Sequence, residues 1–167
     1  LFLGNAGTAM RPLSAALAGD SDAGVRAAAA DALGSFNAKQ GVTLLTTAAK
    51  DASPEVRAAV AEALSSYAAE PATVTLLALL GDSDASVRDA AAESLGYLAD
   101  ARAVSPLVDM LKRDESQAVR ISAAYALAEF DDKRATQALA DVSRADRDAV
   151  VRKAATEALA SAGEEDQ

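Results

Sequence analysis

The sequence predicts an all-α protein, an α-α superhelix in which five helical hairpins stack into a right-handed α-solenoid. Three observations lead to this prediction. One short motif recurs five times, the copies are 31 or 32 residues apart, and each copy opens the apolar spacing of an amphipathic helix. A single hairpin of this size cannot bury its apolar faces alone, whereas stacked hairpins share one continuous core.

The recurring motif is a Val-Arg dipeptide with an Asp five residues before the Val and a Leu eight residues after it. The dipeptides are Val25-Arg26, Val56-Arg57, Val87-Arg88, Val119-Arg120 and Val151-Arg152. The Asp residues are Asp20, Asp51, Asp82, Asp114 and Asp146, and the Leu residues are Leu33, Leu64, Leu95, Leu127 and Leu159. Three fixed positions in five copies exclude chance, so the chain is built from repeats.

The residues after each Val predict the second helix of each hairpin, helix B. From Val87, small or apolar side chains fall at i+3, i+4, i+7 and i+8, which is one face of an α-helix. This face extends to the residue eleven positions after each of the first four Val residues: Phe36, Tyr67, Leu98 and Phe130. Short polar residues suited to N-caps stand three positions before each Val, namely Asp22, Ser53, Asp84, Ser116 and Asp148.

A less regular apolar segment before each helix B predicts helix A of the hairpin. Its markers lie twelve residues before each Val, and they are Leu13, Leu44, Thr75, Leu107 and Leu139. Pro12, Pro71 and Pro106 are expected in or near the first turns of these helices. The chain is therefore predicted to be a single domain, residues 1–167. Its units lie near 5–36, 37–67, 68–99, 100–131 and 132–162, and residues 163–167 form a frayed tail.

Composition excludes several classes of function. Without His or Cys, the chain has no Ser-His-Asp or Cys-His catalytic group and no zinc site of the usual kind, so we expect neither an enzyme nor a cofactor. The net charge of −9 opposes nucleic-acid binding, which depends on Lys and Arg. No apolar run is long enough to span a membrane, and the cytoplasm is the expected location.

The pattern Asp-x-x-x-x-Val-Arg-x-x-Ala-x-x-x-Leu resembles HEAT repeats of the phycobilisome-lyase-like (PBS lyase HEAT-like) type, most clearly at residues 82–96. The resemblance covers nearly the whole chain and implies an armadillo-like solenoid that acts as a protein-interaction scaffold. It also implies a structural ladder between units, in which the five Asp residues of the motif link with Arg26, Arg57, Arg88, Arg120 and Arg152. An accessory subunit of a bilin lyase-like enzyme remains an alternative.

A second resemblance involves the N-terminal segment, residues 1–17. The stretch from Leu1 to Leu13 is similar to the active-site motif of enolpyruvylshikimate phosphate (EPSP) synthase, in which the matching loop helps form the phosphoenolpyruvate and glyphosate pocket. The matching residues are Asn5, Ala6, Gly7, Thr8 and Arg11. Because the rest of that enzyme is absent, we expect helix A of the first unit here, with residues 4–8 as its leading loop. The alternative is a loop that binds a small anion such as phosphoenolpyruvate or glyphosate.

One exposed position of helix B predicts where a partner binds. Six residues after each Val lie Asp31, Glu62, Glu93, Tyr125 and Glu157. Successive B helices stack in parallel, so these residues form an acidic stripe if helix B faces the concave side of the rod. Such a stripe attracts a basic peptide or protein surface. The alternative is an ordinary solvated helix face. The sequence leaves the oligomeric state open.

Overall fold

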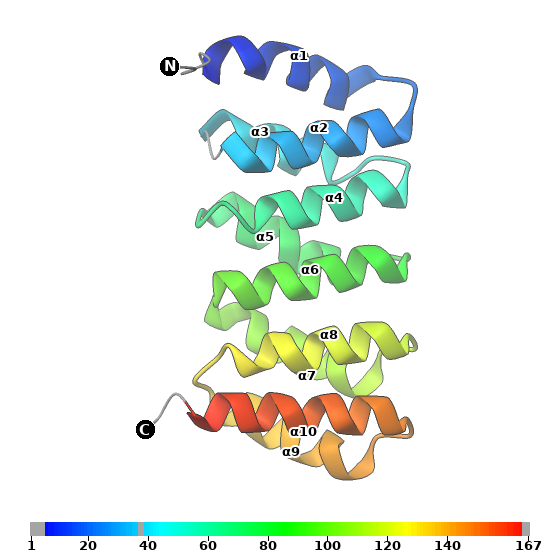
Figure 1. The fold of residues 1–167 in the computed structure, drawn as a ribbon, viewed down its shortest axis with the longest axis vertical. Helices are drawn as coiled ribbons and strands as arrows, with labels where there is room; N and C mark the ends of the chain where they lie inside the picture. Colours follow the sequence, from blue (N-terminus) through cyan, green and yellow to red (C-terminus); the bar gives the residue numbers. More distant parts are fainter. Residues whose placement is uncertain (1–5, 37–38, 165–167) are drawn as a thin grey trace.

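The computed structural model describes residues 6–36 and 39–164, and every regular element in these ranges is a helix. The five hairpins follow one another along a rod, as Figure 1 shows. They are α1 (Ala6–Gly19) with α2 (Ala23–Phe36), α3 (Lys39–Ala48) with α4 (Pro54–Leu64), α5 (Glu70–Leu79) with α6 (Ala85–Leu98), α7 (Val104–Arg113) with α8 (Gln117–Ala128), and α9 (Lys133–Ala145) with α10 (Ala149–Glu164). A short 3-10 helix, η1 (Ala101–Ala103), leads into α7. The all-α solenoid predicted from the repeat is confirmed.

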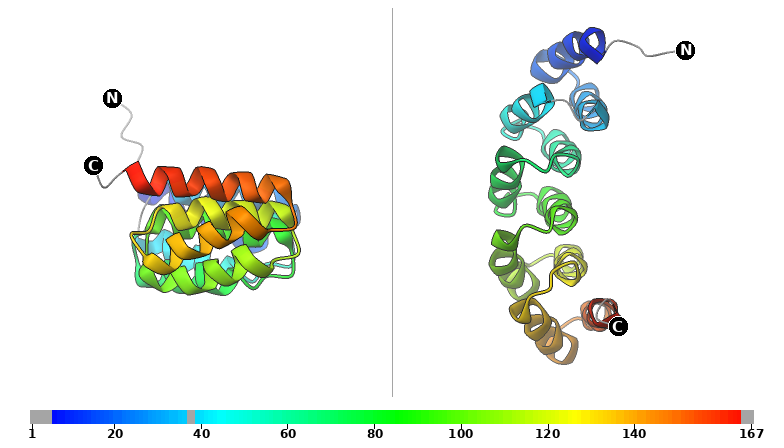
Figure 2. Two further views of the ribbon diagram at one scale, coloured as in Figure 1. Left: turned by 90° about the horizontal axis from the view of Figure 1, so that it is seen from below. Right: turned by 90° about the vertical axis from the view of Figure 1, so that its left-hand side faces the viewer.

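The two helices of each hairpin lie in separate layers of the rod. The A helices (α1, α3, α5, α7 and α9) form the outer, convex layer, and the B helices (α2, α4, α6, α8 and α10) form the inner layer (Figure 2, right). In this view the middle of the row of B helices lies further left than its two ends. The faces of the B helices that point away from the A helices therefore line the concave side of the arc. Each B helix packs against the next one along the rod. Equivalent positions of the B helices therefore lie beside one another.

Side-chain caps explain where most B helices begin. Asp84 Oδ1 accepts a hydrogen bond from the Ser86 N–H at 2.9 Å, and Asp22 accepts from the Gly24 N–H at 2.8 Å. Asp148 does the same for the Val150 N–H at 3.0 Å. These bonds satisfy donors that the first helical turn leaves free. Ser53 makes no side-chain cap bond, and Pro54 begins α4 at a position where its missing N–H costs nothing.

The core lies between the two layers and consists mainly of the repeated Val, Leu and Ala. The motif Val is fully buried in the last four hairpins, and the motif Leu is fully buried in the first four. Alanines on the B helices, such as Ala30, Ala61, Ala92 and Ala124, are also fully buried. Small side chains at these positions allow neighbouring B helices to approach closely, which fills a core that contains few aromatic residues.

Two glycines on the B helices leave no room for a side chain against the next B helix. A Cβ built on Gly34 in α2 would stand 2.9 Å from Ala63 Cα in α4, and one on Gly96 in α6 would stand 3.0 Å from Ala126 Cα in α8. These glycines are required by the packing of neighbouring helix backbones rather than by an unusual backbone conformation.

Replacing Gly34 with alanine is expected to destabilise the protein by about 1–3 kcal/mol, because the added methyl group forces two helix backbones apart. Helix propensity alone predicts the opposite sign, a gain of up to about 1 kcal/mol. Gly19→Ala is the matched control, since no atom lies within 4 Å of its added Cβ. Urea unfolding of both variants measures the difference. Equal or greater stability of Gly34→Ala would contradict this packing.

Two boundaries differ from the sequence prediction. Helix α1 begins at Ala6, so Ala6–Thr8 are helical rather than part of a leading loop, and Pro12 lies inside the helix rather than in its first turn. The predicted tail at residues 163–167 is wrong for its first two positions, because α10 continues to Glu164. The last turns of α10 are rich in Ala and favour the helix. They outweigh the helix-propensity penalty of Gly163, which is only about 1 kcal/mol relative to Ala. Residues 1–5, 37–38 and 165–167, with the unit limits predicted there, lie outside the described residues.

Candidate functional site

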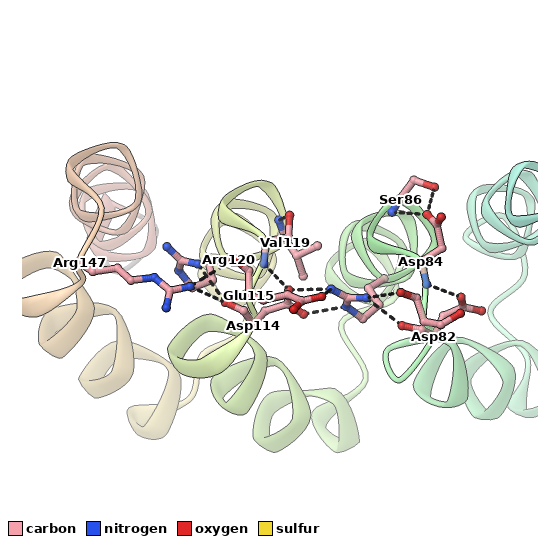
Figure 3. Close-up of polar contacts among 11 residues, drawn as sticks. Asp82, Asp84, Ser86, Asp114, Glu115, Val119, Arg120 and Arg147 are labelled. Carbon is pink, nitrogen blue, oxygen red and sulfur yellow. Dashed lines mark hydrogen bonds and ion pairs between the residues drawn. The ribbon is translucent and has the colours of Figure 1, made fainter.

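The repeated Arg and Asp side chains form a ladder that joins successive hairpins. Arg26, Arg57, Arg88 and Arg120 each donate through Nε and Nη2 to both carboxylate oxygens of the Asp in the next hairpin, and Figure 3 shows part of this row. The Nε–Oδ2 distances are 2.8 Å for Arg26–Asp51, 2.7 Å for Arg57–Asp82, 2.8 Å for Arg88–Asp114 and 3.1 Å for Arg120–Asp146. A paired geometry of this kind is among the stronger side-chain interactions in proteins.

The same residues also fix the turn within each hairpin. Arg88 Nη1 donates to the carbonyl oxygen of Asp82 at 2.9 Å, and Asp82 Oδ1 accepts from the Asp84 N–H at 2.9 Å. All five arginines and all five aspartates of the motif make the corresponding contacts in their own turns. Each rung therefore ties a turn to the following turn, which is a structural role and leaves no free carboxylate in the paired rungs.

Electrostatic contacts shift the pKa of the ladder carboxylates. Hydrogen bonds from Arg26 and Arg57 lower the pKa of Asp51 and Asp82, respectively. For Asp114, burial acts to raise the pKa, but the bonds from Arg88 and the Ser116 N–H prevail and lower it. These groups are held as carboxylates near neutral pH, so they are not poised for proton transfer.

The residues of the acidic stripe, Asp31, Glu62, Glu93, Tyr125 and Glu157, are all exposed. They lie on α2, α4, α6, α8 and α10, one on each B helix. Tyr125 donates its hydroxyl to Glu157 Oε2 at 2.8 Å, which shows that neighbouring members reach one another. Lys153 also contacts Glu157, at 3.3 Å, and is a basic residue within the stripe. The structure thus places the stripe across successive B helices, on the layer that lines the concave side.

Two carboxyl groups of the stripe have raised pKa values. The pKa of Glu93 is raised by partial burial and by the nearby carboxylates of Asp89 and Glu62. Partial burial likewise raises the pKa of Asp31. Burial is the main cause in both cases, because it disfavours the charged form of a carboxyl group.

A shallow groove between α6 and α8 adds a second aromatic ring, Tyr97, beside Tyr125 of the stripe. We call it the tyrosine groove, and its lining residues are Glu93, Gly96, Tyr97, Ser122, Tyr125, Ala126 and Glu129. Tyr97 is 80% exposed and Tyr125 is 45% exposed, so both rings are accessible to a partner. The cavity of about 130 Å³ is smaller than the roughly 300–1,000 Å³ of small-molecule pockets, so it suits a single side chain.

Sequence reasoning missed Tyr97 and Glu129, although a signal was available. Tyr97 lies four residues after Glu93, and Glu129 lies four residues after Tyr125. Residues spaced by four share a helix face, so each stripe member predicts a neighbour one turn further along. Ser122, which also lines the groove, joins its two helices. The Ser122 hydroxyl on α8 donates a hydrogen bond to Asp89 Oδ1 on α6 at 2.6 Å.

The predicted anion loop is not formed as a loop. Ala6, Gly7, Thr8 and Arg11 all belong to α1, and Asn5 lies outside the described residues.

Within residues 6–36 and 39–164, no group of three or more acidic side chains is arranged to hold a metal ion. The described part of the chain also contains no helix with the length and apolar character needed to cross a membrane.

Comparison with known families identifies the repeat. The family model for HEAT repeats matches residues 10–94 and residues 73–160. A comparison with curated proteins gave no match, so the EPSP synthase resemblance of the N-terminal segment has no support from it.

Solved structures of similar fold include both engineered and natural proteins. An engineered protein, Northeast Structural Genomics Consortium target OR329, is 25% identical with a TM-score of 0.60, over 91% of this chain and 78% of that chain. The complex of CpcE and CpcF of phycocyanin lyase from Nostoc sp. PCC7120 gives 23% and 0.62, over 86% and 60% of the two chains. A designed armadillo repeat protein in complex with the peptide (KR)4 gives 23% and 0.63, over 90% and 80%. These likenesses show the solenoid fold.

Proposed function

Because the chain belongs to the HEAT repeat family, we propose that it is a non-catalytic protein-interaction scaffold whose concave face binds a basic, extended segment of a partner protein. The observation that carries this proposal is the acidic stripe together with the tyrosine groove. Acidic side chains without balancing cations attract Lys and Arg, and exposed tyrosine rings offer them cation–π contacts.

The spacing of the B helices indicates the length of the bound segment and the spacing of its basic residues. Neighbouring helix axes lie roughly 9 Å apart, so the stripe is about 36 Å long, which is the reach of about eleven residues of extended chain. In a polyproline II conformation, which has three residues and about 9 Å per turn, a basic residue at every third position would point to the stripe and meet one B helix each. A solenoid of this type can hold a basic peptide, since the designed armadillo repeat protein of similar fold is in complex with (KR)4.

The absence of catalysis is part of the proposal. It rests on a sequence without His or Cys and on ladder carboxylates that are already paired with arginines. Bilin lyase-like accessory function and an EPSP-synthase-related role remain less supported, because the likeness to the phycocyanin lyase complex extends to the fold alone and the N-terminal segment is helical from Ala6.

Charge reversal on the stripe is the test. Fluorescence anisotropy would measure binding of a labelled peptide with Arg at every third position, using the wild type and the Glu62→Lys/Glu93→Lys double variant. We expect the variant to bind at least about tenfold more weakly, because two attractive contacts become repulsive. Affinity of the wild type should also fall as salt is added.

The matched control changes the same charge elsewhere. Asp109 on α7 and Asp131 in the turn after α8 are both exposed and lie outside the stripe and the tyrosine groove. The Asp109→Lys/Asp131→Lys variant should keep most of the affinity. If both double variants lose affinity equally, net charge alone governs binding. If neither loses affinity, the stripe is not the binding surface.

A further inference from the structure

Helices α6 and α8 carry the same two residue types in opposite order. On α6, Glu93 is followed one helical turn later by Tyr97. On α8, Tyr125 is followed one turn later by Glu129. The first residue of each pair lies six positions after the motif Val, and the second lies ten positions after it. The two helices are parallel neighbours (Figure 1), so each tyrosine stands beside a carboxylate of the other helix.

The tyrosine groove brings these four side chains around one cavity of about 130 Å³. We call the four residues the Tyr-Glu cage: Glu93, Tyr97, Tyr125 and Glu129. The buried residues Gly96 and Ala126 also line the cavity, and neither has a side chain larger than a methyl group. Space for one group of a ligand is therefore left between two aromatic rings and two carboxylates.

The cage has carboxylates but no cation of its own. Within the described residues, no Lys or Arg lines the tyrosine groove. Apart from the ladder arginines, the only basic residue on the five B helices is Lys153, which pairs with Glu157 at 3.3 Å. Glu157 also accepts the hydroxyl of Tyr125, and this bond holds the Tyr125 ring in place. A cation in the cage would therefore come from a binding partner.

The combination of two rings and two carboxylates occurs at one pair of B helices. At the position of Tyr97, the first, second and fifth hairpins have serine, and the fourth has Glu129. At the position of Tyr125, the other four hairpins have Asp or Glu. Two tyrosines therefore meet only between α6 and α8, which distinguishes this point of the stripe from the others.

We propose that the Tyr-Glu cage is an arginine pocket, which holds one arginine side chain of the partner segment and prefers it to lysine. This inference rests on the proposed function, because the arginine belongs to the basic segment that the concave face binds. A guanidinium group is planar, stacks on aromatic rings and donates several N–H groups to carboxylates. A lysine ammonium is compact and more strongly hydrated, so it gains less from the rings. Since the cage occurs once, the bound arginine also fixes the register of the segment along the stripe.

Fluorescence anisotropy with matched labelled peptides measures the preference. The first peptide has Lys at every third position, the second replaces one central Lys with Arg, and the third contains two Arg residues. We expect the wild type to bind the second peptide at least about fivefold more tightly than the first. The third should gain little further, because the second Arg has no cage to enter. Equal affinity for the first two peptides, or an equal gain from each Arg, overturns the arginine pocket.

The Tyr97→Ser variant locates the preference. Tyr97 is 80% exposed, and serine stands at this position in three other hairpins, so the variant should fold, as judged by circular dichroism. We expect it to bind the one-Arg peptide no better than the Lys peptide. Val74→Ser on α5 is the matched control, because Val74 is 52% exposed and lies outside the groove. It should keep the preference. A preference that survives Tyr97→Ser, or that both variants lose, contradicts the assignment to the cage.

A stripe variant outside the cage separates this inference from the proposed function. Glu62→Lys should weaken binding of the Lys peptide and the one-Arg peptide by the same factor, because it changes the stripe and leaves the cage intact. If the wild type binds both peptides equally and Glu62→Lys weakens both, the basic-segment function stands and only the arginine pocket is wrong. If the wild type binds none of the peptides, both proposals are wrong.

Discussion

Replacing Arg88 with alanine is expected to lower the free energy of unfolding by about 3 kcal/mol, because it leaves the Asp114 carboxylate buried without its partner. Both side chains of this pair are only 9% exposed, and two direct bonds of 2.8 Å join them. Arg88 also holds the carbonyl oxygens of Asp82 and Ser83, so its loss loosens two turns at once. Urea unfolding followed by circular dichroism measures the change.

Arg102→Ala is the matched control for the ladder variant. Arg102 is well exposed and pairs with Glu70 and Asp100 in solvent, where an ion pair contributes little. Its loss should barely move the unfolding midpoint. Equal effects of the two variants would show that the ladder contributes no more than a surface ion pair.

Acidification should reduce the difference between wild type and Arg88→Ala. The pKa of Asp114 is lowered in the folded protein, so this pair stabilises the fold above the unfolded-state pKa of about 3.9. The stabilisation declines as the pH falls through the lower folded-state value, because the carboxylate then becomes protonated.

Truncating Leu95 to alanine is the second large effect, with an expected loss of about 3–4 kcal/mol. Leu95 is fully buried in the central hairpin, and α6 packs against both α4 and α8. The cavity that the truncated side chain leaves is therefore bounded by three hairpins that hold one another in place. Their mutual packing limits how far the surrounding structure can collapse into this cavity. Chemical denaturation gives the magnitude.

Leu159→Ala removes the same atoms at the equivalent position of the last hairpin. Leu159 is only partly buried, so the expected loss is smaller, about 1–2 kcal/mol. The ratio of the two losses tests whether stability depends on stacking between neighbours. A larger loss for the terminal residue would contradict the end-exposed geometry of hairpin 5.

Most of the fold could be predicted from sequence because each repeat encodes the same local rules. The spacing from Val87 to Leu95 determines a helix face, and Asp84 determines where that helix begins. Errors occurred where the pattern has no repeat to support it. Pro12 suggested a later helix start, but α1 begins at Ala6, and α10 continues through Gly163 to Glu164.

The candidate site was predicted only in part. Glu62 and Glu93 were predicted as stripe residues because they share a repeat position, whereas Tyr97 stands at a repeat position where no other hairpin has an aromatic residue and is marked only by its spacing from Glu93. Repetition reveals what the hairpins have in common, and a binding surface depends also on how they differ. The tyrosine groove arises because Tyr97 and Tyr125, which occupy different positions of the repeat, come from successive hairpins whose helices α6 and α8 lie side by side.

By itself, the sequence determined that small apolar residues recur with one period and that each hairpin needs a neighbour, since these properties are local and repeat along the chain. Only the tertiary structure decided which layer faces inward and which Asp meets which Arg. Those outcomes depend on the curvature and register of stacked helices, which are set by contacts such as Gly34 against Ala63 rather than by any single segment.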